Sequence, residues 1–221
     1  MSKKLLTVKI ESILVNVNGE VPGAKPDKTN QRNVLTATLL YPRSGAPSVA
    51  SAKQFDLQPG KSPDRLDQAD FFSCGLFKEE VNDETILEIA VTDRDIASNF
   101  EKGFVQVFSA ILGAGLTAAT AGTGQILGAI TGLALKAITG GVKNAGADSS
   151  VTIGQTDKVR LKMDDLAEAP TRMTLGFTVP ALIEKNFFAP GPTGDPVEQR
   201  MRIEAGSANG TITLLVSATP A

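Results

Sequence analysis

Hydrophobic and polar residues alternate along several short stretches of this chain, and such alternation predicts β-strands. Leu6, Val8 and Ile10 occupy every second position of the first stretch, with polar residues between Leu6 and Ile10. Residues 85–92 (TILEIAVT) and 211–217 (TITLLVS) are equally rich in strand-forming side chains. The extended character of the first stretch continues through residues 13–17, and further strands are predicted at residues 34–41, 52–57, 70–77, 159–163, 173–179 and 201–203. About eight short strands separated by turn residues predict a mainly β fold, an antiparallel β-sandwich.

Polar segments rich in Gly and Pro separate these stretches. Residues 19–32, 59–68 and 186–199 have this composition, and we predict loops there. Asn209-Gly210 is a turn pair typical of β-hairpins.

One long segment breaks the strand pattern, because residues 104–135 contain no charged side chain. Its small residues recur every four positions, and residues four apart share one face of a helix. The segment therefore predicts two closely packed helices that reverse at residues 122–124. We expect an inserted helical hairpin over residues 104–149, within a β-domain formed by residues 1–103 and 150–221. The two rows of small residues are Ala110, Ala114, Ala118 and Gly122, and then Gly124, Gly128 and Gly132.

The partner of this hairpin is left open by the sequence. A membrane-spanning helix needs about 20 mostly apolar residues, and glycines spaced by four are typical of membrane helix pairs. However, the segment is rich in Ala, Gly and Thr, and Lys136 interrupts its second predicted helix. Bulky apolar residues also lie on most sides of each predicted helix. A helix that is apolar all round must be buried on several sides. We therefore favour contact with other copies of the chain or with lipid over packing on its own β-domain.

Composition narrows the functional classes. The chain has 221 residues and a net charge of −2, so no broad basic surface is expected to attract nucleic acid. It contains no histidine, which excludes Ser-His-Asp and Cys-His catalysis. The single cysteine, Cys74, lies in an apolar stretch and is interpreted as a small buried residue. We expect a protein that is not an enzyme, and the sequence identifies no small-molecule substrate.

The N-terminal stretch MSKKLLTVKIESILV has no clean apolar core and no cleavage-site pattern. We therefore expect no signal peptide, and a location in the cytoplasm or at the periphery of a membrane.

Three acidic residues follow the strand at residues 85–92. Asp93 and Asp95 point the same way on an extended chain, and Glu101 returns after a short turn. Converging carboxylates are what calcium requires as ligands. A solvated acidic turn is the alternative interpretation of the same residues.

This stretch resembles the C2 domain, a β-sandwich family known for calcium-dependent phospholipid binding. In that family a V-x-V strand leads into D-x-D-x5-D and then Gly. Here Ala90-Val91-Thr92 leads into Asp93-Arg94-Asp95, with Glu101 at the third acidic position and Gly103 after it.

The resemblance implies a C2-like antiparallel β-sandwich and a second calcium loop between the early strands. Asp27 would be the ligand from that loop, whereas Asn33 departs from the family pattern because it carries no charge. The calcium ligands implied are Asp93, Asp95, Glu101 and Asp27.

Two functions follow as expectations. The first is a non-enzymatic C2-like module that binds phospholipid membranes or forms a homo-oligomer through its glycine-zipper hairpin, with calcium as a candidate modulator. The second is a structural subunit of a large assembly, such as a tube, sheath or shell, without a role at lipid.

Overall fold

The structure is a computed structural model, and it describes residues 3–19, 32–41, 49–63, 66–94, 151–190, 192 and 195–221. Within these residues the protein is mainly β and its strands pair antiparallel, as the sequence predicted. The described residues form eleven strands, where about eight were expected. The predicted helical hairpin, with all seven of its small residues, lies outside the described residues.

The strands in chain order are β1 (Lys4–Val15), β2 (Arg32–Leu40), β3 (Val49–Phe55), β4 (Gly75–Val81), β5 (Glu84–Arg94), β6 (Val151–Gln155), β7 (Val159–Lys162), β8 (Thr171–Thr178), β9 (Ile183–Pro190), β10 (Pro196–Ile203) and β11 (Ala208–Pro220). The described helices are α1 (Phe71–Cys74) and the short 3₁₀ helix η2 (Met163–Asp165).

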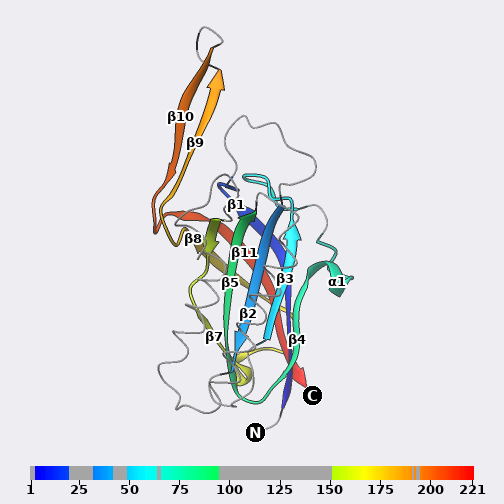
Figure 1. Cartoon of the computed structure of the whole chain (residues 1–221). Helices are drawn as coiled ribbons and strands as arrows, with labels where there is room; N and C mark the ends of the chain where they lie inside the picture. The colour runs from blue at the N-terminus through cyan, green and yellow to red at the C-terminus, as the bar shows by residue number, and fades with distance from the viewer. Residues whose placement is uncertain are drawn as a thin grey trace.

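Nine of these strands form one strongly curved sheet (Figure 1). Its order is β3-β2-β5-β6-β8-β11-β1-β4, with β7 also paired to β5. The two end strands, β3 and β4, come close to each other, so the sheet is nearly closed and we call it the barrel. Curling of a large twisted sheet lets one face enclose a single apolar core.

The first and last strands of the chain lie side by side in the barrel. β1 pairs with β11 from Lys4↔Pro220 to Val15↔Gly210 and with β4 on its other side. Its inward residues are fully buried up to Ile10, and the register then shifts between Ile10 and Ser12. This β-bulge makes Ile13 point inward again, because one additional residue restores the alternation.

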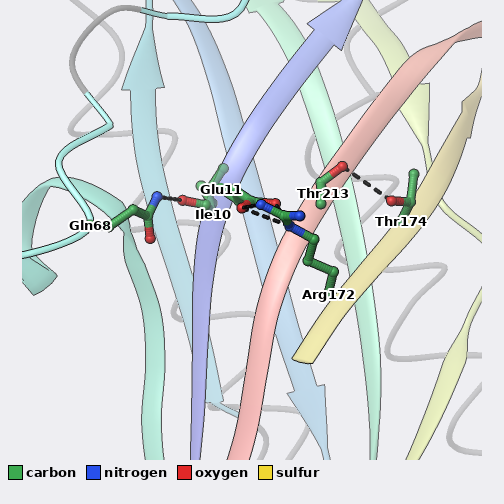
Figure 2. A network of polar contacts seen from close by, with 6 residues as sticks. All are labelled: Ile10, Glu11, Gln68, Arg172, Thr174 and Thr213. Atoms are coloured by element: carbon green, nitrogen blue, oxygen red, sulfur yellow. Dashed lines mark hydrogen bonds and ion pairs between the residues drawn. The ribbon is translucent and has the colours of Figure 1, made fainter. Parts of the chain in front are cut away.

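The outer face over this bulge carries a polar network (Figure 2). Arg172 of β8 donates from Nε and Nη2 to the carboxylate of Glu11, at 2.7–2.9 Å. Thr174 and Thr213 are hydrogen-bonded at 3.2 Å, and Gln68 Nε2 donates to the Ile10 carbonyl oxygen at 2.7 Å. The network thus links β1, β11 and β8 across the outside of the barrel.

Strands β9 and β10 form a separate two-stranded sheet that stands out from the barrel (Figure 1). Their register runs from Ile183↔Ile203 to Pro190↔Pro196, and we call this hairpin the arm. The prediction of a loop at residues 186–199 was therefore wrong. Pro190 and Pro196, which contributed to that prediction, are the last residue of β9 and the first residue of β10. Both strands contain many polar residues because both faces meet solvent over most of their length.

The strand predicted at residues 70–77 was wrong in its first half. Asp70 caps helix α1 by accepting a hydrogen bond from the Phe72 amide at 2.9 Å, and β4 begins only at Gly75. A local side-chain cap thus competes successfully with strand formation.

Gly210 gives a test of the pairing between β1 and β11. Its φ is +110°, and a Cβ there would clash with the Leu14 carbonyl oxygen. We expect Gly210→Ala to lower the free energy of unfolding by about 2 kcal/mol or more, through strain and steric overlap. Gly176→Ala is the control, because no atom lies within 4 Å of a Cβ at that position. Urea unfolding of both variants measures the difference, and equal stabilities would contradict the expectation.

Candidate functional site

Of the four residues proposed as calcium ligands, one lies within the described residues. Asp93 lies at the end of β5 and is buried, with 3% of its surface exposed. Asp27, Asp95 and Glu101 fall outside the described residues. The backbone pairs Arg32↔Arg94 and Asn33↔Asp93 place the start of β2 beside the end of β5. The segments at residues 20–31 and 95–150 are therefore attached to the same end of the barrel.

Buried amide side chains close this end of the barrel. Asn209 Nδ2 donates to the carbonyl oxygens of Val17 and Ile153, at 2.8 and 2.7 Å. Asn18 Nδ2 donates to Leu57 O at 3.0 Å, and Asn33 Nδ2 donates to Asn18 O at 2.9 Å. These bonds fix the chain that follows β1, and they satisfy backbone groups that burial would otherwise leave without a partner.

Asp93 belongs to this end of the barrel and is bound by a lysine from the arm. Lys185 Nζ on β9 lies 3.0 Å from Asp93 Oδ2 and also donates to the Gly19 carbonyl oxygen at 2.7 Å. The side chains of Lys185 and Asp93 are 20% and 4% exposed, so the ion pair is largely shielded from water. Gly19 has a φ of +91°, and a Cβ there would clash with the Asp93 carboxylate. Glycine at this position is required for the close approach.

This geometry determines what Asp93 can do. A buried carboxylate needs a positive charge nearby, and here an ammonium group provides it. A metal ion at Asp93 would have to share the carboxylate with Lys185 or displace it. Within the described residues no group of three or more potential metal ligands is present.

A second buried carboxylate, Glu88, lies on β5 with 5% of its surface exposed. Gln155 Nε2 donates to its Oε1 at 2.5 Å, and Oε2 has no hydrogen-bond partner in the described chain. Burial raises the pKa of Glu88, while the Gln155 hydrogen bond and the charge of Lys158 act in the opposite direction. The shift follows from burial, so we assign no chemical role to Glu88.

The arm presents apolar side chains to solvent. Ile183 at its base is buried in the barrel core, whereas Phe188 and Val197 farther out are 72% and 46% exposed. One face of β9 is exposed at every position, and the other is half-buried beyond Ile183. The described structure thus contains a projecting element that bears apolar groups at its outer half.

Sequence reasoning missed both the arm and Lys185. The arm could have been found from the Pro- and Gly-rich sequence at residues 190–196, which is a hairpin signal when two stretches of similar length flank it. Lys185 had no such pattern, because its partner Asp93 is distant along the chain and only the fold brings them together.

The fold and this site define a curved antiparallel β-protein with a projecting two-stranded arm. No protein-family model matches the chain, and no curated protein matches it either. Among the residues that the structure describes, no helix is long and apolar enough to cross a membrane.

The Asp93–Lys185 ion pair can be tested by removing its cation. We expect Lys185→Met to lower the free energy of unfolding by about 2–3 kcal/mol, because the buried Asp93 carboxylate loses its charged partner. Lys3→Met is the matched control, since the Lys3–Glu80 pair is exposed on both sides, and its loss should change stability by about 0.5 kcal/mol or less. Denaturant unfolding measures both. The double variant Asp93→Asn/Lys185→Met should lose less than the sum of its single changes, and additive losses would show that the two groups do not interact.

Proposed function

We propose that this protein is a non-enzymatic structural subunit that associates with further copies of itself, and that the arm is a contact element. The observation that supports this proposal most directly is the isolation of the arm. Within the described chain, β9 and β10 pair only with each other. A two-stranded hairpin is marginally stable in water, and three or more strands or a packing surface are needed for independent stability.

The barrel does not need the outer part of the arm. Its buried core is drawn from the barrel strands, together with Leu57, Met163, Val179 and the base residue Ile183. Phe187, Phe188 and Val197 are absent from that buried cluster. An exposed phenylalanine on a projecting hairpin costs solubility and adds nothing to the barrel, so a partner surface is the natural explanation.

The helical hairpin at residues 104–149 remains a prediction within this proposal. Its glycine rows would provide a second contact between copies, at the end of the barrel where that segment is attached. The C2-like character of the barrel also stays a proposal, supported by the antiparallel topology and by the strand that leads into Asp93.

Membrane binding with calcium as a modulator is the second candidate. It is favoured by the backbone pairing of Arg32 with Arg94. This pairing places the start of β2, the strand that follows Asp27 in the sequence, beside the end of β5, which contains Asp93. The Lys185 ammonium beside Asp93 weighs against a calcium site, since it already balances the charge of that carboxylate.

If the chain associates through the arm, replacing an exposed apolar side chain of the arm by a polar one should weaken self-association. Phe188→Ser should weaken self-association by roughly tenfold, because a large apolar contact would be lost from a protein interface. Phe72→Ser is the matched control: Phe72 lies on α1, away from the arm, and is 90% exposed. Sedimentation velocity over a concentration series measures both. A wild-type chain that stays monomeric throughout would refute the role of the arm, and equal effects of the two changes would exclude the exposed face of β9 from the contact.

The membrane candidate requires a separate measurement. If it is correct, the chain should float with vesicles of mixed neutral and anionic phospholipid, and calcium should increase the bound fraction. Asp93→Asn should reduce the calcium effect while leaving any calcium-independent binding in place. Absence of flotation with and without calcium would exclude this second function.

A further inference from the structure

We propose that the arm contact is formed by β10 pairing antiparallel with β10 of a second copy, around a two-fold axis at Gln199. This inference rests on the proposed self-association and specifies its surface and register. The result would be a four-stranded sheet made of two arms.

The free edge of β10 is the first observation. Within the described residues β10 pairs with β9 alone, so its other edge presents unpaired backbone N–H and C=O groups. Such an edge is a template for another strand, and addition of a strand there is a common mode of protein association. Two further strands would also bring the arm to the number that makes a small sheet stable.

The charges along β10 are the second observation, and they select one register. With the axis at Gln199, Glu198 lies opposite Arg200 of the second copy, and Arg200 lies opposite Glu198. Opposite charges at directly facing positions stabilise a sheet, and like charges destabilise it. An axis at Glu198 would set two Glu198 side chains against each other. An axis at Arg200 would pair Glu198 with Arg202 but would also set two Arg200 side chains against each other, whereas the axis at Gln199 creates no like-charge pair. An axis at Met201 would place Arg200 opposite Arg202.

The other face of β10 fits the same register. Residues two apart on a strand share a face, so Val197 and Met201 lie on the face opposite to Glu198 and Arg200. Around an axis at Gln199, Val197 faces Met201 of the second copy. Val197 is 46% exposed, and this apolar contact would cover it.

The ion pairs within one arm leave Glu198 available. Arg200 forms an ion pair with Glu184 of β9, and Arg202 contacts Glu184 and Glu204. Glu198 makes no ion pair within the part of the chain that the structure describes. Because a guanidinium carries five N–H donors, Arg200 can bind Glu184 of its own arm and Glu198 of the second copy together.

The outer edge of β9 offers no comparable solution. Its two charged residues, Glu184 and Lys185, are adjacent and therefore point to opposite faces. When two copies of a strand pair around a two-fold axis perpendicular to the sheet, residues that lie opposite each other are on the same face. No register of β9 with itself can therefore place Glu184 of one copy opposite Lys185 of the other.

Disulfide trapping tests the register. In a Cys74→Ser background, Gln199→Cys should give a covalent dimer on mild oxidation, since position 199 is the one that faces itself. Glu198→Cys alone and Arg200→Cys alone should not, because each introduced thiol is offset from its own copy by about 7 Å along the strands. An equimolar mixture of these two variants should form the mixed dimer. The same oxidation in urea controls for random collision.

A charge variant provides a readout that does not depend on thiol geometry. Glu198→Arg should raise the dissociation constant for self-association about tenfold or more, because it places arginine opposite arginine at two sites. Glu168→Arg, the same charge change at an exposed position outside the arm, should leave it unchanged.

The outcomes separate this inference from the proposed function. Self-association that persists without a dimer at position 199, and without an effect of Glu198→Arg, would overturn the register while the subunit function stands. Dimers of equal yield at 198, 199 and 200 would overturn it as well. A chain that is monomeric at every concentration would refute both.

Discussion

The pairing of β1 with β11 is the constraint on which the rest of the structure depends. It joins the first and last strands of the chain along almost their whole length. Both strands contribute alternating, fully buried residues to the core, and β1 also carries β4 at the end of the sheet. Without this ladder the sheet would have two distant ends and no enclosed interior. Contacts of such separation along the chain are costly in loop entropy, so the core must repay them.

The end of the barrel shows how the same closure organises the polar groups. Once β1, β5 and β11 are aligned, Asn18, Asp93 and Asn209 are all buried at the same end of the barrel. Their hydrogen bonds fix the chain after β1, and Lys185 anchors the base of the arm to Asp93. Among the described residues, the arm is thus anchored at its base by Lys185, and its strands pair only with each other. That combination suits an element that presents a fixed surface to a partner.

Prediction from sequence succeeded where one face of a strand is buried and failed where both faces are exposed. Alternation revealed β1, β5 and β11, because their inward residues must be apolar to fill the barrel. The strands of the arm were not predicted, because Glu184, Glu198 and Arg200 face solvent and the strands lack a continuous apolar face. The first half of the strand predicted at 70–77 failed because the Asp70 cap forms a helical turn there. Of the candidate site, Asp93 alone lies within the described residues.

The sequence by itself determined the antiparallel β character and the absence of histidine chemistry, since both follow from residue types and their local spacing. Tertiary structure decided the nearly closed sheet, the projecting arm and the partner of Asp93. These depend on contacts between residues far apart in the chain, such as Asp93 and Lys185. Local pattern carries no record of such contacts, because the energy of a buried charge is set by what surrounds it after folding.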